Sequence, residues 1–272
     1  MECVAMIAKE SMVKRKSVRT YMDEQIDSSL MDRLQKYTDV VSSPFDTNIR
    51  YEIIDAKQGE GLGTHGFIKG VNTFICMAVQ DQERTEENLG YTTEKIILYA
   101  VSLGLGTCWL VESINKDHFA KAMGLKNGEI LPAVVAIGYP AEKRSIRDKA
   151  KFTITHSKDR KDWSEIFFDK DFTQPLNKEN SGVYSEALEM LRIAPSGFNT
   201  QPWRVIKSHD SFHFFVERKK KKNGFDYDKL YIGIAMSHFE VALNEIGIYG
   251  RWIDENPNLS KDNKEYVISF II

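Results

Sequence analysis

The sequence predicts an α+β protein that consists of two related halves in one polypeptide. Segments with a helical spacing of apolar residues alternate with short apolar runs that are typical of strands. After a polar stretch, Asp169–Asn180, the same order of elements begins again. The chain has 272 residues, of which 42% are hydrophobic and 28% charged, so it can bury a sizeable core. We therefore expect one half over residues 1–168 and the other over residues 169–272.

The first half is expected to begin with a helix over Ser28–Val40, because apolar residues such as Leu34 recur on one of its faces. Asp27 stands at the N-cap position of this helix. A second helix is expected over Asn88–Gly104, where the glycine ends the apolar spacing. The other elements expected here are strands over Ile49–Ile54, Val71–Val79 and Leu131–Ile137, a helix over Asn115–Met123, and a short apolar element over Trp163–Phe168.

The second half repeats this order. Helices are expected over Val183–Ile193 and Ile234–Ile246, separated by a proline-containing loop and two apolar runs. The strands expected here cover Trp203–Lys207, Ser211–Glu217 and Val267–Ile272, and a segment with no assigned structure, Tyr249–Ile253, follows the second helix.

Two residue spacings also recur in the two halves, and they do so in the same order. The pairs concerned are Pro44–Asn48 with Pro195–Asn199, and Gly104–Trp109 with Gly247–Trp252. This repetition indicates a diverged internal duplication.

Composition excludes several classes of protein. The 37 basic and 39 acidic residues give a net charge of -2, which argues against a nucleic-acid-binding surface. No apolar run reaches the roughly 18 residues of a membrane-spanning helix, and the N-terminus does not resemble a signal peptide. We therefore expect a cytoplasmic protein. Cys76 and Cys108 lie in apolar runs and are expected to be buried thiols, and the six histidines show no metal-ligand spacing.

A basic segment, Arg15-Lys16-Ser17-Val18-Arg19, can clamp a phosphate group. Arginine offers paired N–H donors that match phosphate oxygens, and serine adds a neutral donor. In an extended chain Arg15, Ser17 and Arg19 would point to the same side. The alternative interpretation is a solvated basic stretch near the terminus.

A second segment, Ala194–Trp203, carries two prolines, a glycine and several short polar side chains. The prolines stiffen the loop, and Gly197 permits close approach of another group. Ser196, Asn199 and Gln201 offer donors and acceptors suited to a polar heterocycle. The alternative is a structural loop whose side chains satisfy local backbone groups.

One further motif is rejected. Residues 61–66 match the glycine spacing of a dinucleotide-binding turn, but that turn must be followed at once by a helix. Here the strand expected over Val71–Val79 follows after a few residues, so a Rossmann interpretation fails.

Taken together, these segments resemble the nitroreductase family. The stretch from Arg15 to Tyr21 is similar to its N-terminal FMN-binding motif, and Pro195 to Trp203 to its flavin-contacting loop. Further similar stretches are Leu103 to Trp109, Ile137 to Pro140, and the basic pair Lys158 and Arg160 before Trp163. The resemblance implies a nitroreductase-like fold, with a central, mostly antiparallel sheet flanked by helices.

The order of the motifs differs from that of an ordinary family member. The first proline loop, residues 43–48, lacks the Gln-Pro-Trp ending, and the second half lacks the arginine–serine motif. This pattern resembles a single-chain, duplicated subgroup whose two pseudo-symmetric halves mimic the family dimer. It implies one FMN site per chain, built from both halves, and favours a monomer over a homodimer.

The resemblance also implies roles for individual residues. Arg15, Lys158 and Arg160 would hold the FMN phosphate, and Ser17 and Arg19 would reach the ribityl chain and the pyrimidine side of the ring. The other residues expected to bind the cofactor are Lys16, Lys69, Leu110, Val111, Pro195, Ser196, Gly197, Asn199 and Gln201, with the backbone of Leu110 and Val111 near the reactive N5.

The implied activity is that of an FMN-dependent NAD(P)H oxidoreductase. NADH or NADPH would deliver hydride to flavin N5, and a small organic acceptor such as a nitroaromatic or quinone would then be reduced. No protein acid or base is required, so we assign no catalytic residue and no metal. An FMN-binding module, such as a flavin store or sensor without turnover, is the alternative; a related flavin reaction and a plain structural protein are further ones.

Overall fold

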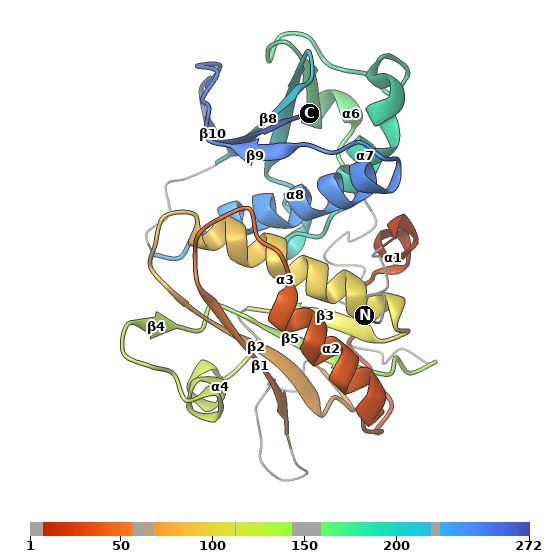
Figure 1. Cartoon of the computed structure of the whole chain (residues 1–272), viewed down its shortest axis with the longest axis vertical. Helices are drawn as coiled ribbons and strands as arrows, with labels where there is room; N and C mark the ends of the chain where they lie inside the picture. Colours follow the sequence, from red (N-terminus) through yellow and green to blue (C-terminus); the bar gives the residue numbers. More distant parts are fainter. Residues whose placement is uncertain (1–7, 57–63, 65–67, 112, 143–158, 219–223) are drawn as a thin grey trace. The chain divides into compact units, whose positions relative to one another are not determined.

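The computed structural model describes residues 8–56, 64, 68–111, 113–142, 159–218 and 224–272 (Figure 1). The chain forms two compact units whose segments interleave along the sequence. The first unit comprises Met1–Val41, Asp46–Thr85 and Lys95–Thr155, and the second comprises Ser42–Phe45, Glu86–Glu94 and His156–Ile272. Helix α3 (Thr85–Ser102) therefore contributes residues to both units.

The first unit contains an antiparallel sheet in the order β1-β2-β5-β3, with β4 paired to β2. Strand β2 lies inside this sheet, and its residues from Thr73 to Val79 are all buried, as expected for an apolar run without alternation. The strands are β1 (Ile49–Asp55), β2 (Thr73–Gln80), β3 (Gly106–Leu110), β4 (Glu129–Ile130) and β5 (Val134–Gly138).

The helices of the first unit are α1 (Lys9–Lys14), α2 (Ser28–Val40) and α4 (Lys116–Met123), besides the end of α3. Helix α2 has the bounds predicted for it, and α2 packs on α3 through stacked Tyr37 and Tyr99 rings, 4.3 Å apart. Asp27 occupies the N-cap position but makes no capping hydrogen bond. Its carboxylate instead accepts from the Tyr139 hydroxyl at 2.9 Å.

The second unit contains a sheet in the order β6-β7-β8-β10-β9, in which only the β6–β7 pair is parallel. The strands are β6 (Phe167–Asp169), β7 (Trp203–Ser208), β8 (Ser211–Glu217), β9 (Arg251–Ile253) and β10 (Lys264–Ile271). The predicted α+β class and the mostly antiparallel pairing are confirmed, with the strands divided between two sheets, one in each unit.

Helix α8 (Tyr227–Glu245) is the central helix of the second unit and lies beside its sheet (Figure 1). It begins seven residues before the predicted start, because the Asp226 carboxylate caps the backbone N–H groups of Asp228 and Lys229. The Phe239 ring meets Phe212, Phe214 and Phe270 of the sheet edge to face. The remaining helical elements are α6 (Trp163–Ile166), η1 (Glu179–Tyr184), α7 (Ser185–Arg192) and η2 (Gly197–Asn199).

Within the second unit, residues 86–94 of α3 cross α8 at very close range. A Cβ added to Gly90 would lie 2.0 Å from the Leu230 carbonyl oxygen, and one added to Gly233 would lie 2.0 Å from the Glu87 carbonyl oxygen. The crossing is reciprocal, because each glycine meets the carbonyl three positions before the other. Both sites therefore require glycine.

The same crossing brings together a fully buried pair, Glu94 and His238. His238 Nδ1 lies 3.0 Å from the Met190 carbonyl oxygen, and Nε2 lies 3.1 Å from Glu94 Oε1. A carbonyl oxygen only accepts, so Nδ1 is the donor to Met190. Both ring nitrogens therefore have a polar partner, which lowers the cost of burying them.

The two sheets share one connectivity. In each, a hairpin (β1–β2 or β7–β8) precedes a long helix (α3 or α8), and the next strand lies at an edge beside the unit's last strand. Both long helices end at a glycine with positive φ, Gly104 or Gly247, followed by the same pair of backbone hydrogen bonds.

We expect Gly90→Ala and Gly233→Ala to lower the free energy of unfolding by similar amounts, roughly 3 kcal/mol each, because the methyl group meets rigid backbone. The control is Gly104→Ala, since a Cβ there would meet no atom within 4 Å but φ is +85°. That strain should cost only about 1 kcal/mol. Urea unfolding of the three variants tests this, and equal stability losses at Gly90 and Gly104 would contradict the crossing geometry.

Candidate functional site

In the first unit, the predicted phosphate-binding segment runs beside β3. Ser17 forms a parallel bridge with Thr107, and the Val18 N–H donates to the Thr107 carbonyl at 2.9 Å. Val18 is buried in the core, where a Cβ on Gly106 would come within 2.8 Å of its side chain. Side chains alternate in direction along an extended segment. Because Val18 points into the core, its neighbours Ser17 and Arg19 face the other way, and both are half-buried.

The segment continues past Lys69, which was predicted to lie near the flavin. The Lys69 N–H donates to the Arg19 carbonyl at 3.0 Å, and the Tyr21 N–H donates to the Lys69 carbonyl at 2.8 Å. The following residue, Gly70, has φ of +72°, and a Cβ there would lie 2.3 Å from the Tyr21 carbonyl oxygen. The structure therefore brings Lys69 and Arg19, far apart in the sequence, to one place.

The other predicted residues of the first unit lie on the same element or close to it. Leu110 is the last residue of β3, pairs with Val134 and is buried; Val111 follows it and is half-buried. Arg15 is half-buried at the end of α1, and Lys16 is exposed.

In the second unit, the loop after α7 has an unusual backbone. Phe198, Asn199 and Gln201 all have positive φ, between 47° and 56°, although none is glycine. Such conformations cost about 1 kcal/mol or more each and persist only where surrounding contacts enforce them. A loop of this kind is typical of a functional site.

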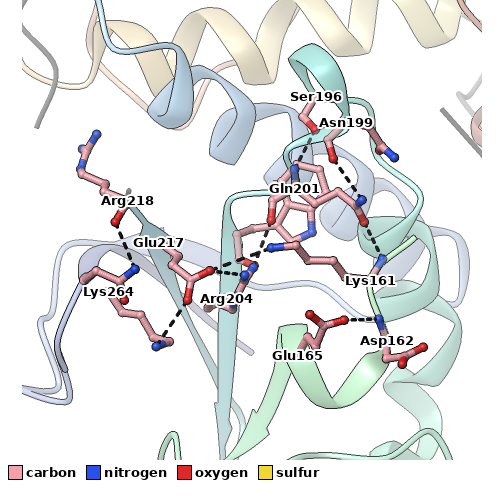
Figure 2. A network of polar contacts seen from close by, with 12 residues as sticks. Lys161, Asp162, Glu165, Ser196, Asn199, Gln201, Arg204, Glu217, Arg218 and Lys264 are labelled. Carbon is pink, nitrogen blue, oxygen red and sulfur yellow. Dashed lines mark hydrogen bonds and ion pairs between the residues drawn. The ribbon is translucent and has the colours of Figure 1, made fainter. Parts of the chain in front are cut away.

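Those contacts come from the side chains of the loop itself (Figure 2). Gln201 Oε1 accepts from the Lys161 N–H at 2.9 Å, and Gln201 Nε2 donates to the Asp159 and Asn199 carbonyls at 3.3 and 3.2 Å. Asn199 Nδ2 donates to the Asp159 carbonyl at 2.7 Å. Ser196 Oγ accepts from the Gln201 N–H at 2.9 Å. The side chains of the loop thus form hydrogen bonds with the backbone of residues 159–161.

Arg160 is the middle residue of this segment, and its side chain also takes part in the network. Its Nη1 donates to Asn199 Oδ1 at 2.9 Å and to the Asp159 carbonyl at 3.2 Å, and its Nη2 donates to the Ile193 carbonyl at 3.0 Å. These three acceptors are neutral oxygens, so they orient the guanidinium without cancelling its charge. Two segments predicted from separate motifs therefore meet in one network.

A second arginine anchors the loop to the sheet. Arg204 is almost fully buried, donates to the Gln201 carbonyl at 3.0 Å and pairs with the Glu217 carboxylate (Figure 2). Burial lowers the pKa of this guanidinium, and the Glu217 charge opposes that shift. Lys161 and Lys264 also approach Glu217, at 3.9 and 3.5 Å. The sequence analysis did not identify this cluster, although two opposite charges at the ends of neighbouring apolar strands were a usable signal.

Gly197 has a packing role in the same loop. A Cβ at this position would lie 2.1 Å from the Tyr231 hydroxyl of α8. Close approach, rather than positive φ, is therefore what requires glycine here. Pro195 and Ser196 are half-buried, and Phe198 is exposed.

Some predictions lie outside the described residues, namely Lys158 and most of the rejected glycine motif at 61–66. The predicted buried thiols are confirmed: Cys76 and Cys108 are both buried, and burial raises the pKa of Cys76 to about 12. The described part of the chain holds no group of three or more residues able to bind a metal ion. None of its helices has the length and apolar character needed to cross a bilayer.

Comparison with known proteins identifies the family. A family model described as "Putative TM nitroreductase" matches residues 8–243, which is most of the chain. This chain belongs to that nitroreductase family. A general oxidoreductase role follows from this membership.

A solved structure that covers the whole chain agrees on the fold. A crystal structure described as a "putative nitroreductase" from Thermotoga maritima is 17% identical, with a TM-score of 0.65, over 100% of this chain and 95% of that one. An "FMN-dependent Nitroreductase" from Clostridium difficile is 21% identical, with a TM-score of 0.43, over 52% of this chain and 90% of that one. No curated protein matches the sequence.

We expect Glu217→Gln to destabilise this nitroreductase by about 1.5–3 kcal/mol, because Arg204 would remain buried without its counter-charge. Glu265→Gln is the matched control. Glu265 lies on the neighbouring strand, and its carboxylate is 2.9 Å from Arg218 Nε, but the Glu265 side chain is 56% exposed. Its loss should cost less than about 1 kcal/mol. Thermal unfolding of both variants measures the difference, and equal melting temperatures would argue against a structural ion pair at Arg204.

Proposed function

We propose that this chain is an FMN-dependent NAD(P)H oxidoreductase that reduces a small organic acceptor, such as a nitroaromatic or a quinone. The observation that carries this proposal is the contact between Arg160 and the loop that ends in Gln201. Each belongs to a different stretch that resembles a flavin-binding motif of the family. Their convergence on one network supports a common role.

The residues present fit the chemistry of FMN. A phosphate group needs paired cationic donors and neutral donors, and Arg15, Ser17, Arg160 and the predicted Lys158 offer both kinds. In the described geometry, neutral oxygens hold the Arg160 guanidinium, and Ser17 faces away from the core. The donor set therefore suits an anionic cofactor better than a neutral one.

FMN, when bound, would accept hydride at N5 from NADH or NADPH and pass the electrons to the acceptor. The role of the protein would be binding and electrostatic tuning. Arg19 and Lys69, joined through their backbones, would place positive charge beside the pyrimidine edge and so favour reduction. The backbone of Leu110 and Val111 would face N5, and Pro195, Ser196 and Gly197 would line the ring.

We also propose that the chain is a fused pseudo-dimer that works as a monomer. The shared connectivity of the two sheets supports this interpretation. Three pairs of like residues have the same separation in sequence, namely Gly90 and Gly233, Gly104 and Gly247, and Trp109 and Trp252. The reciprocal crossing at Gly90 and Gly233 is the arrangement expected from an internal two-fold axis. One FMN per chain would follow, because only one arginine–serine motif is present.

A flavin-binding module without turnover is the second candidate. The incomplete first loop, residues 43–48, favours it, because that segment lacks the Gln-Pro-Trp ending of the second loop. In the structure, the Ser43 hydroxyl of this first loop donates a hydrogen bond to the side-chain oxygen of Asn88.

The visible absorption spectrum of purified protein tests these proposals. We expect a flavin band at one FMN per 31.2 kDa chain, and anaerobic NADH or NADPH should bleach it. A band that persists with both donors would favour the binding module. Protein that takes up no flavin even from added FMN would overturn the proposal.

We expect Arg19→Ala to lower the reduction potential of the bound flavin by about 30 mV, a tenfold change in the two-electron equilibrium. The rate of reduction by NAD(P)H should fall as well, because positive charge beside the ring is lost. Lys14→Ala is the control, since Lys14 is exposed and pairs with Glu10 at 2.6 Å. An unchanged potential and rate in Arg19→Ala would remove this residue from the site.

A further inference from the structure

The loop amides Asn199 and Gln201 are committed to contacts within the protein. Both polar atoms of each side chain take part in hydrogen bonds to residues 159–161 or to the loop itself. Gln201 is only 3% exposed. Each amide therefore already uses its oxygen as an acceptor and its nitrogen as a donor within the protein.

The segment that they hold is fixed from other directions too. The Lys161 carbonyl accepts from Arg192 Nη1 of α7 at 3.2 Å. Immediately after it, Asp162 and Glu165 form a capping box at the start of α6, with the Asp162 N–H donating to Glu165 Oε2 at 3.0 Å. Residues 159–161 therefore lie between α6, α7 and the loop, and Arg160 is the cation that this arrangement presents.

We propose that Asn199 and Gln201 are positioning residues, which set the place and direction of the Arg160 guanidinium for an anionic group of the cofactor. Asn199 acts on the guanidinium directly, and Gln201 acts on the peptide groups on both sides of it. The three positive-φ residues of the loop bring the two amides to the same stretch of backbone. This inference rests on the proposed function and assigns to these residues a role other than flavin contact.

The first test needs no flavin. Hydrogen exchange of the Lys161 amide in the full chain should become about tenfold faster in Gln201→Ala, since its acceptor is lost. Thr200→Ala is the matched control, because Thr200 is exposed and lies between the two amides. Exchange at Lys161 that is unchanged in Gln201→Ala would overturn the positioning role.

The second test compares FMN with riboflavin, which lacks the phosphate, by fluorescence titration of flavin-free protein. Asn199→Ala should weaken FMN binding by about tenfold, the effect of roughly one hydrogen bond, and leave riboflavin binding within about twofold. In Arg160→Ala the further loss of Asn199 should have no added effect, because the amide acts through the arginine. Thr200→Ala should alter neither affinity.

The outcomes separate the two ideas. Wild-type protein that binds neither flavin, or binds both equally, would overturn the proposed function, and the inference would fall with it. Wild-type protein that prefers FMN, with the preference intact in Asn199→Ala, would overturn the positioning role alone. A loss that is equal for FMN and riboflavin, or additive with Arg160→Ala, would also overturn it, because it indicates general damage to the loop.

Discussion

The absence of side chains at Gly90 and Gly233 governs the packing of the second unit. With only hydrogen at these positions, the backbones of α3 and α8 approach until each glycine touches a carbonyl of the other helix. The middle of α8, residues 232–239, can then be buried on all sides, with α3 on one side and the phenylalanines of the sheet on another. Any side chain at the crossing would separate the helices and open the core on both sides.

The buried and half-buried polar groups beside this crossing depend on the same proximity. Glu94 of α3 reaches His238 of α8, and Glu240 of α8 accepts from both Tyr91 of α3 and Trp252 of β9 at 2.6 Å. Buried carboxylates are tolerated only when their partners are held in place. The glycine contact therefore fixes a set of hydrogen bonds that selects one arrangement of the two helices.

The spacing of apolar residues predicted the amphipathic elements well. It predicted less well the elements that are buried on most sides or that form only by pairing with a distant strand. Helix α2 has one apolar face and was placed correctly, whereas the first turns of α8 are apolar on most sides and show no helical spacing. Strand β4 was missed because two residues carry no periodicity and owe their conformation to pairing with β2. In the candidate site, the motifs located Arg160 and the loop, but apart from the Arg160–Asn199 bond the contacts between them use backbone groups, which any residue supplies.

The two arginines that bond to the loop differ in the charge of their hydrogen-bond acceptors. Arg204 and Arg160 both bond to the loop, but Arg204 is buried against the Glu217 carboxylate, which neutralises it. The acceptors described for Arg160 are an amide and two peptide carbonyls, which fix direction and leave positive charge. Arg204 can therefore brace the strained loop against the sheet, whereas the role proposed for Arg160 is to meet an anion in a direction set by neutral groups. On that proposal, the strain at Phe198, Asn199 and Gln201 is the cost of holding a cation with neutral groups.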